Sequence, residues 1–581
     1  MADVDFQKLT LRYARSADQD ARTPARHPVI VVGAGPVGLA LAIDLAQKGV
    51  RTIVLDDDDK LSTGSRAICF AKRTLEICDR LGVGDRLVEK GVSWNVGKVY
   101  FQDELVYAFD LLPDSGHRRP AFINLQQYYF EGYLYERAAA VPGVDVRWKN
   151  RVVAVEPRDD HVALTVETPD GPYRVEAAYV VACDGSRSPV RAMLGEESRG
   201  RVFHDRFLIA DVKMKADLPA ERWFWFDPPF HRNQSVLLHM QPDNVWRIDF
   251  QLGWDANPDE ERKPERVVSR VKALLGESAR FEFEWISVYT FACQRMDHFV
   301  HRRVIFAGDS AHGVSPFGAR GANSGVQDAD NLGWKLALVL AGSAPAALLD
   351  SYAVEREYAA DENIRHSTRS TDFITPKSEM SRSFRNAVLK LAKDHPFARR
   401  LVNSGRLSLP TTLTASPLNT PDRDAFAGLM VPGAPVADAP VRLDGRDGWF
   451  LPHTGDRFTV VYFSIAGTPA TGLVSAPGLL AELAALADAP IPVVPVVVVR
   501  DGAAQNGAGA GMPRGAARSA TRAAPAGLTV LEDVEALLAD RFDAQDGTTY
   551  LIRPDQHVCA RWRRFDPAAI RAAVARATCN A

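Results

Sequence analysis

The fold of this chain is decided by the stretch Val29-Ile-Val-Val-Gly33-Ala-Gly35-Pro-Val-Gly38-Leu-Ala-Leu-Ala-Ile-Asp44. An apolar run predicts a buried strand, glycines predict a turn, and a second apolar run predicts a helix. Gly33 permits the tight turn, Gly35 lets the backbone approach phosphates, and Gly38 lets the helix pack closely on the strand. Phosphates would meet amide groups at the positive end of the helix dipole. The stretch therefore predicts a nucleotide-pyrophosphate site in an α/β fold.

A second strand and an acidic residue follow this turn at the expected spacing. The strand Arg51-Thr-Ile-Val-Leu55 ends at Asp56, which is placed to bind a ribose hydroxyl. The run Asp56–Asp59 would repel a 2′-phosphate. The order of strand, turn, helix, strand and acid predicts a dinucleotide site, but it does not choose between FAD and NAD.

Two distant segments make that choice. The first is Tyr179-Val-Val-Ala-Cys-Asp184-Gly185, and the second is Arg303-Val-Ile-Phe-Ala-Gly308-Asp309-Ser-Ala-His312. With the first motif they resemble the DG and GD motifs of the single-component flavoprotein aromatic hydroxylases, the family of p-hydroxybenzoate, phenol and 3-(3-hydroxyphenyl)propionate hydroxylases. The resemblance is close over residues 28–365 and looser in the remainder.

The resemblance implies bound FAD and a set of residues that hold it. By it, Asp309 would bind the ribityl hydroxyls, and Gly321, Ala322 and Asn323 would offer backbone amides to the flavin ring from the start of a helix. Arg66 matches an arginine that shields the swinging ring, and Gln127 matches a glutamine that binds FAD; the alternatives are a surface arginine and a helix cap. The expected cofactor-binding residues are Gly33, Gly35, Gly38, Asp56, Arg66, Gln127, Asp184, Gly185, Gly308, Asp309, Gly321, Ala322 and Asn323.

The chain departs from the family pattern at two places. The family has two glycines and a glutamine where this chain has Gly318-Ala319-Arg320, so Ala319 restricts the loop and Arg320 adds charge beside the ring or the substrate. Ile68 stands where the phenol hydroxylase branch has an aspartate that assists catalysis. We therefore name no general base, although Tyr289 or a water chain could serve to ionise a phenol.

Alternating strands from about residue 203 predict a mostly antiparallel sheet, which in this family forms the substrate pocket. The expected strands are 207–212, 221–226, 234–240 and 245–252. In the last of them, Arg247, Asp249 and Gln251 share one face. Arg247 matches a strand arginine near the flavin, and the alternative is a solvated outer face. Trp223, Trp225 and Tyr289 are candidate pocket aromatics, or core.

The catalytic candidates are Pro316, Arg247 and Tyr289; Pro316 matches a proline that lines the reactive face of the ring, and His312 is expected to support its loop. The predicted fold class is α/β, with a Rossmann-like FAD-binding domain, an inserted antiparallel substrate sheet and a C-terminal thioredoxin-like domain. The expected segments are a flexible arm over 1–27, the FAD-binding domain over 28–200 and 295–405, the inserted sheet over 201–294, a linker over 406–445 and the thioredoxin-like domain over 446–581. That last domain has no CxxC, so a structural or dimer-forming role is expected, with a loop over 501–526 and helices near 476–487, 531–541 and 566–577.

Composition fits an ordinary globular protein. The net charge of −3 gives no reason to expect nucleic acid. The six cysteines form no CxxC pair and no metal-like cluster, so we expect reduced thiols and no metal. No signal peptide and no membrane span are evident, and a cytoplasmic homodimer is expected.

Taken together, the motifs and the resemblance predict an FAD-dependent monooxygenase. The resemblance implies that NAD(P)H reduces the flavin and that O2 then forms a flavin C4a-hydroperoxide, which hydroxylates a phenolic or other electron-rich ring. A polyketide or antibiotic hydroxylase on the same scaffold is an open alternative. A non-catalytic flavin- or nucleotide-binding protein is another, and the complete DG and GD motifs argue against it. A flavin-dependent halogenase would need a WxWxIP-like signature, which is not seen here.

Overall fold

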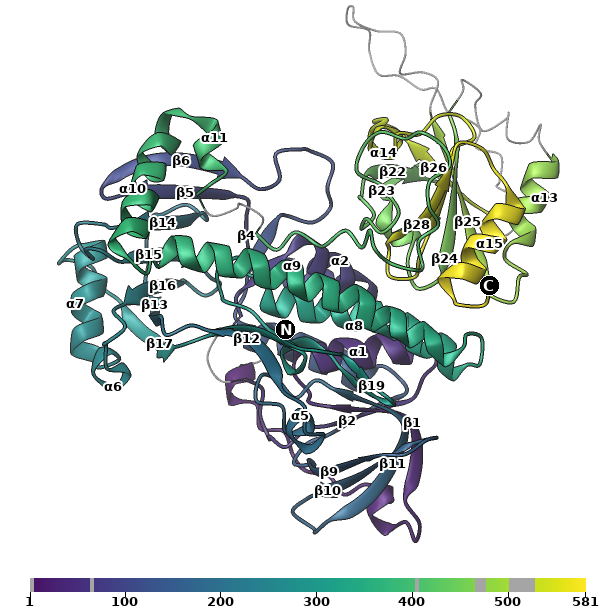
Figure 1. Cartoon of the computed structure of the whole chain (residues 1–581), viewed down its shortest axis with the longest axis horizontal. Helices are drawn as coiled ribbons and strands as arrows, with labels where there is room; N and C mark the ends of the chain where they lie inside the picture. The colour runs from purple at the N-terminus through teal and green to yellow at the C-terminus, as the bar shows by residue number, and fades with distance from the viewer. Residues whose placement is uncertain (1–4, 63–66, 403–406, 466–476, 501–527) are drawn as a thin grey trace, which may run out of the picture. The chain divides into compact units, whose positions relative to one another are not determined.

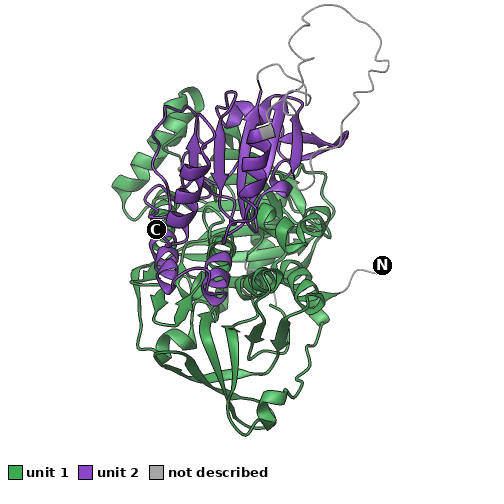
Figure 2. Ribbon diagram, turned by 90° about the vertical axis from the view of Figure 1, so that its right-hand side faces the viewer, with its two compact units in different colours: residues 1–113, 119–333, 356–409 green, residues 114–118, 334–355, 410–581 purple. Residues whose placement is uncertain are grey.

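The structure is a computed structural model that describes residues 5–62, 67–402, 407–465, 477–500 and 528–581. It divides into two compact units (Figure 2). Unit 1 comprises Met1–Pro113, Arg119–Gly333 and Arg356–Leu409, and unit 2 comprises Asp114–Arg118, Trp334–Glu355 and Pro410–Ala581. The flavin-type motifs all lie in unit 1.

A parallel sheet forms the centre of unit 1, as the opening stretch predicts. β1 (Ala25–Val32) pairs in parallel with β2 (Thr52–Leu55) on one side and β11 (Tyr173–Ala182) on the other. The strand order is β19-β20-β11-β1-β2-β8, with β8 at Val144–Arg147, β19 at Val300–His301 and β20 at Val304–Phe306. β9 (Arg151–Pro157) and β10 (Val162–Glu167) extend this sheet from β11.

The motifs gather at one edge of this sheet because each follows the carboxyl end of a strand. Gly33 follows β1, Asp56 follows β2, and Asp184 and Gly308 come two residues after β11 and β20. These four strands are neighbours in the sheet. Ligands of open α/β sheets bind at this edge.

A second sheet holds the strands that were predicted for the substrate pocket. Its order is β17 (Glu282–Tyr289), β13 (Arg206–Lys213), β16 (Val245–Leu252), β15 (Ser235–Met240), β14 (Arg222–Phe226), β5 (Val96–Phe101) and β6 (Glu104–Asp110). The pairings are antiparallel except that of β14 with β5, which confirms the mostly antiparallel sheet. The last two strands come from outside the expected segment 201–294. Their pairing with β14 joins distant parts of the chain, which strand periodicity does not reveal.

Both faces of the second sheet are covered. Trp246, Ile248 and Phe250 pack with α7 (Pro264–Leu275), which follows the short helix α6 (Pro258–Glu261). Trp225 and Trp223 belong to this α7 side, so the expectation that they line the pocket is wrong. On the other face, α10 (Glu379–Asp394) and α11 (Pro396–Arg399) lie beside β5 and β6 in Figure 1. All eight residues of β16 are buried, so the solvated-face alternative for Arg247 is also wrong.

Small sheets and helices complete unit 1. One sheet joins β3 (Cys69–Ala71), β7 (Phe122–Asn124) and β4 (Val92–Trp94), and another joins β12 (Ser198–Val202), β18 (Ala292–Met296) and β21 (His312–Gly313). The helices are α1 (Pro36–Gln47), α2 (Lys72–Leu81), α3 (Gly84–Lys90), α4 (Gln127–Ala140) and α5 (Pro189–Met193).

The amino-terminal segment is more ordered than the flexible arm expected over 1–27. Short 3-10 helices form at Phe6–Lys8 and Ala17–Asp20, and Phe6 is buried. The Phe6 ring packs edge-on against Tyr129 and Tyr133 of α4, with ring centroids 6.1 and 5.6 Å apart. Buried Phe6 and Leu11, together with the Asp18–Arg147 ion pair, therefore anchor this polar segment.

Two long helices, α8 (Gly321–Leu340) and α9 (Asp350–Ile374), run side by side (Figure 1). Each contributes residues to both units. Within the described ranges, none of the helices combines the length and the apolar character that crossing a membrane requires.

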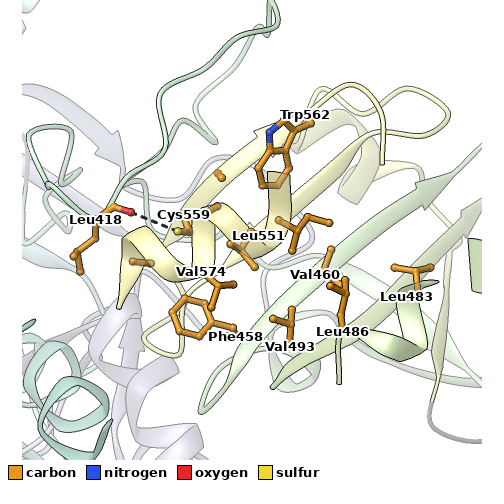
Figure 3. Packing of buried hydrophobic residues seen from close by; sticks show 14 of the residues in the cluster. Leu418, Phe458, Val460, Leu483, Leu486, Val493, Leu551, Cys559, Trp562 and Val574 are labelled. Atoms are coloured by element: carbon orange, nitrogen blue, oxygen red, sulfur yellow. Dashed lines mark hydrogen bonds between the residues drawn. The ribbon is translucent and has the colours of Figure 1, made fainter. Parts of the chain in front are cut away.

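Unit 2 contains a thioredoxin-like α/β domain. Its strand order is β23 (Arg446–Trp449), β22 (Pro440–Leu443), β26 (Thr529–Asp533), β25 (Val493–Arg500), β24 (Phe458–Ser464), β27 (Thr549–Ile552) and β28 (Val558–Trp562). β24 and β25 are parallel, and β27 and β28 are antiparallel to their neighbours. Phe458, Val460 and Leu551 pack in its core with residues of α13 (Pro477–Ala485) and α15 (Pro567–Ala577), as Figure 3 shows.

One local expectation in this domain needs a correction. The helix expected over 531–541 is the strand β26 followed by the short helix α14 (Leu537–Arg541), because Thr529 and Val530 pair with the edge of β25. Further along the chain, β27 and β28 form an antiparallel hairpin. The loop expected over 501–526 lies outside the described residues.

Candidate functional site

A cavity of about 1530 Å³ lies within unit 1, between the carboxyl edge of the parallel sheet and the polar face of the second sheet. It is lined by most of the expected cofactor residues. Those that line it are Gly33, Gly35, Asp56, Gln127, Asp184, Gly185, Asp309, Gly321, Ala322 and Asn323. Gly38 and Gly308 lie behind this lining, and Arg66 lies outside the described residues.

The three glycines of the first turn differ in what surrounds them. Gly33 has a φ of +107°, and a Cβ there would lie 2.5 Å from the Cys183 carbonyl oxygen. A Cβ on Gly38 would lie 2.0 Å from the Gly33 carbonyl oxygen, so helix and strand can pack this closely only without a side chain. A Cβ on Gly35 would meet nothing within 4 Å. The turn is therefore closed behind Gly33 and Gly38 and open at Gly35, which faces the cavity.

Asp56 stands at the end of β2 beside this turn. Its carboxylate accepts hydrogen bonds from the backbone N–H of Ala34 at 2.6 Å and of Asp58 at 2.9 Å. Burial raises the pKa of Asp56 despite these bonds. The carboxylate thus lies at the cavity wall, where a ribose hydroxyl could donate to it.

The two later motifs place their aspartates differently. Asp184 accepts from the Ser188 hydroxyl at 2.6 Å and from the Val190 N–H at 2.9 Å, so it fixes the start of α5. Burial raises its pKa. Asp309 instead is exposed and lines the cavity. Both aspartates line the cavity, and Asp309 is the more exposed of the two.

Asn323 fixes the start of α8 at the cavity. Its side chain accepts from the Ala71 N–H at 2.8 Å and from the Thr74 hydroxyl at 2.6 Å. It donates to the carbonyl oxygens of Cys69 at 2.8 Å and Ala319 at 2.6 Å. With its side chain held in this way, Asn323 can offer only backbone to a ligand, together with Gly321 and Ala322 at the positive end of the helix.

The loop before α8 carries the departure noted in the sequence. Ala319 has a φ of +53°, a left-handed conformation that favours glycine. The Arg320 side chain is buried, lines the cavity and donates to the Asn363 amide oxygen at 2.9 Å. Arg320 thus adds a cation near the start of α8.

His312 supports this loop from behind. It is buried, and its Nε2 lies 2.7 Å from Oδ2 of Asp328. The same carboxylate accepts from the Gly308 N–H at 2.9 Å and from Arg356 Nε at 2.6 Å. Burial opposes ionisation, but His312 and Arg356 lower the pKa of Asp328. A buried carboxylate therefore joins the Asp309 turn to α8 and α9.

Gln127 stands at the start of α4 and lines the cavity. Its Oε1 accepts from the Ala67 N–H at 2.9 Å, and its Nε2 donates to Glu131 at 2.7 Å. Glu131 also accepts from the Ser62 N–H at 2.8 Å. The glutamine thus fixes the residues on both sides of the segment 63–66.

A row of polar side chains crosses the second sheet on its cavity side. Directly paired positions on five adjacent strands bring together Trp285, Asp211, Arg247, His239 and Arg222, in this order. Arg247 donates to both oxygens of Asp211, at 2.8 and 2.7 Å. Arg247 lines the cavity as expected, but its charge is already neutralised by a protein carboxylate.

Arg222 and His239 are site residues that the sequence analysis missed. Both line the cavity and are buried. His239 Nε2 lies 3.5 Å from Asp249 Oδ2, and burial lowers the pKa of His239 to about 4. The imidazole is therefore neutral at neutral pH. The alternation of β14 and β15 could have placed both residues on this face.

The remaining catalytic candidates, Pro316 and Tyr289, also line the cavity. Burial and the nearby Asp249 raise the pKa of Tyr289 well above its usual value, so this phenol stays protonated and can donate a hydrogen bond. Ile68 lines the cavity too, so the place of the family's aspartate is apolar.

These features fit FAD. Open space at Gly35, exposed Asp309 and the bare start of α8 supply a phosphate cradle, a hydroxyl acceptor and a positive end for the ring.

Comparisons with known proteins agree with this fit. The model of the FAD binding domain family matches residues 26–367. A 3-(3-hydroxy-phenyl)propionate/3-hydroxycinnamic acid hydroxylase of Mycolicibacterium smegmatis is 29% identical over 388 residues, covering 65% of this chain and 67% of the relative. A 12-dehydrotetracycline 5-monooxygenase/anhydrotetracycline 6-monooxygenase of Streptomyces rimosus is 32% identical over 362 residues, covering 60% of this chain and 70% of the relative.

Among solved structures, the flavin-dependent monooxygenase PieE in complex with FAD and substrate matches with a TM-score of 0.77 at 21% identity, over 96% of this chain and 100% of that one. This likeness extends the shared fold through the thioredoxin-like domain. The chain therefore belongs to the FAD-binding-domain family of flavin-dependent aromatic monooxygenases.

Proposed function

We propose that this chain hydroxylates a phenolic or similarly electron-rich ring, held where the polar row of the second sheet meets the start of α8. The observation that carries the proposal is a single cavity shared by the dinucleotide turn, the α8 start and Tyr289, Pro316 and His239. When bound, FAD reduced by NADH or NADPH supplies the activated oxygen from O2.

The residues that would hold FAD follow the geometry of the cavity. Asp56 would accept from the adenosine ribose, the backbone at Gly35 would bind the pyrophosphate, and Asp309 would accept from the ribityl hydroxyls. The amides of Gly321 and Ala322 would face the ring, because the helix dipole stabilises negative charge there.

The protein would control the proton of the substrate hydroxyl. Neutral His239 can accept a hydrogen bond from that hydroxyl, and Asp249 can orient the imidazole from the other side. Tyr289 stays protonated because its pKa is raised, so it can donate a hydrogen bond to the substrate but cannot remove its proton. The apolar side chains of Ile68, Pro316 and Phe317 would exclude water.

The test is NADH and NADPH oxidation by the purified FAD-loaded protein across phenols, phenolic acids and polycyclic phenols, with product mass and peroxide measured together. Of the two relatives named above, one is a hydroxylase of 3-(3-hydroxy-phenyl)propionate and 3-hydroxycinnamic acid and the other a monooxygenase of 12-dehydrotetracycline and anhydrotetracycline, so the panel must span both kinds of compound. We expect one class to stimulate oxidation and to yield a product heavier by one oxygen atom. Tight FAD binding without oxygen transfer to any member would contradict the proposal and favour a flavin-binding protein.

We also propose a cytoplasmic homodimer. All six cysteines are free thiols, which suits a reducing compartment. Light scattering of the purified protein tests the dimer, and a monomer mass would refute it.

A further inference from the structure

Arg222 is a buried cation that forms no ion pair with the described part of the chain. The residue is 8% exposed. Its Nη1 is buried without a hydrogen-bond partner, and no carboxylate of the described residues lies within ion-pair distance of its guanidinium. Burying an unpaired charge is costly, so such a group calls for a ligand.

The position of Arg222 directs it to the cavity. It lies opposite His239 on β15, which in turn lies opposite Arg247 on β16, so the three side chains share one face of the sheet. All three line the cavity. Side chains alternate along β14, so Trp223 and Trp225 point to the opposite face from Arg222, where they pack with α7.

Neither acid of this face forms an ion pair with Arg222. Asp211 binds Arg247 through both oxygens. Asp249 lies two residues after Arg247 on β16. It contacts His239 at 3.5 Å and makes no ion pair with Arg222. His239 is neutral at neutral pH and Tyr289 stays protonated, so neither supplies negative charge.

Contacts link this row to the start of α8. His239 Nδ1 lies 3.9 Å from Cys69 Sγ, and the Cys69 carbonyl oxygen accepts from Asn323 at 2.8 Å. The row thus flanks the place where the proposed function puts the ring that is hydroxylated.

We propose that Arg222 binds an oxyanion of the aromatic substrate, a carboxylate or an ionised phenolic oxygen, and thereby orients the ring. This inference rests on the proposed function and names the substrate class: aromatic compounds with an anionic group. The planar guanidinium fork suits two parallel hydrogen bonds to such a group.

The test uses the full-length, FAD-loaded protein with benzoate and benzamide, which have nearly the same shape but differ in charge. Binding is followed by the change in flavin absorbance. We expect benzoate to bind at least about tenfold more tightly than benzamide, and Arg222→Gln to remove this preference. Arg222→Lys should restore part of it. Arg232→Gln removes an arginine that is 58% exposed and should keep the full preference.

A second readout separates ligand binding from a structural role. Because the unpaired charge costs stability, Arg222→Gln should leave the Tm of the substrate-free protein unchanged or raise it by about 2 °C. Benzoate should raise the Tm of the wild type and not that of the variant. A large drop in Tm for Arg222→Gln would overturn the proposal, because it would show that a protein partner is lost.

Other outcomes are equally decisive. A second pair tests the phenolate: 4-nitrophenol at a pH above its pKa is compared with neutral 4-nitroanisole. The proposal is overturned if neither pair shows a preference for the anion, that is, if benzoate binds no better than benzamide or does not saturate, and 4-nitrophenol binds no better than 4-nitroanisole. A preference within the benzoate pair identifies the bound group as a carboxylate, and a preference within the nitrophenol pair identifies it as a phenolate. An FAD-loaded Arg222→Gln variant that keeps the benzoate preference of the wild type also overturns it. Oxygen transfer to neutral phenols with no anion preference would refute this inference while leaving the proposed function standing.

Discussion

Single residues divide the work of the first turn, and this division can be tested by adding one methyl group. At Gly35 a Cβ meets nothing within 4 Å, whereas at Gly38 it lies 2.0 Å from a backbone oxygen. We expect Gly35→Ala to fold with unchanged stability but to bind FAD about 10–100-fold more weakly, because the methyl group occupies the space of the phosphates. Gly38→Ala should lower the stability itself.

Titration of the refolded apoprotein with FAD, beside thermal melting of the same samples, checks this pair. If Gly35→Ala bound FAD like the wild type, the phosphates would not lie over this residue. If Gly38→Ala melted like the wild type, the close contact of helix and strand would not matter for the fold.

His239 gives a second prediction at this scale, on the pH dependence of stability. Burial lowers its pKa from 6.5 to about 4, so between these values the unfolded chain binds a proton that the folded chain does not. The free energy of unfolding should therefore fall as the pH decreases through this window, by up to about 3 kcal/mol. His239→Gln should remove this part of the pH dependence.

Denaturant unfolding of the FAD-loaded protein at several pH values across the window measures the effect. His298→Gln replaces an exposed histidine and should keep the wild-type slope. An unchanged slope in His239→Gln would show that the imidazole is protonated in the folded state, and its role as a neutral acceptor would fail.

Periodicity predicted the second sheet better than it predicted the site on it. The alternation of 245–252 placed Arg247, Asp249 and Gln251 on one face, as the structure shows. The alternation could not decide whether that face was exposed to solvent, because burial depends on which other parts of the chain cover it. Alternation could also have placed Arg222 and His239 on this face, but not beside Arg247. Their meeting with Arg247 requires the register between three strands, which alternation within one strand does not contain.

The loop that leads into α8 gives a prediction for one structural element. Ala319 adopts a φ of +53°, where the Cβ of alanine clashes with the backbone and glycine does not. We expect Ala319→Gly to raise the free energy of unfolding by about 1 kcal/mol, net of the flexibility that glycine adds to the unfolded chain. The strain would be the cost of setting the α8 start and Arg320 beside the ring.

Denaturant unfolding measures this change, with Ala337→Gly as the matched control. Ala337 lies inside α8, where glycine should cost about 1 kcal/mol instead. The same sign for both substitutions would mean that Ala319 is not strained. An Ala319→Gly variant with weaker FAD binding would support a positioning role for the loop.

For the whole molecule, the fold class and the motif order followed from the sequence, but the division into units did not. The resemblance to the phenol hydroxylase branch implied a thioredoxin-like domain over 446–581, whereas unit 2 also includes Asp114–Arg118 and Trp334–Glu355. The segment Trp334–Glu355 belongs to unit 2 because its apolar side chains, Trp334 and Leu348 among them, are part of the core of that domain. An amphipathic helix shows that it packs, but not on what it packs.

A buried ion cluster within unit 2 accompanies this core. Glu355 accepts from Lys335 at 2.7 Å and from Arg553 at 2.5 and 3.0 Å, and Arg553 also binds Asp555 at 2.5 Å. Burial opposes the charge on Glu355, but Arg553 and Lys335 lower its pKa well below the usual 4.5. Burial lowers the pKa of Lys335 to about 8, so both cations are charged at neutral pH and depend on Glu355.

The last prediction is that Glu355→Gln destabilises unit 2 without affecting the flavin site. Removing this charge leaves Lys335 without its carboxylate and Arg553 with Asp555 alone, at a cost of about 3–5 kcal/mol and a drop in Tm of about 10 °C. The folded pKa of Glu355 is lowered, so its stabilisation is present above pH 4.5 and is lost as the pH falls below that value. The difference in stability between variant and wild type should therefore narrow in acid.

The cavity lies wholly in unit 1, so FAD affinity at 25 °C should not change. Calorimetry and FAD titration measure the two effects, and Glu379→Gln, on an exposed surface, should change neither. Loss of FAD affinity in Glu355→Gln would contradict this independence, and it would mean that the ion cluster controls the flavin site through α8.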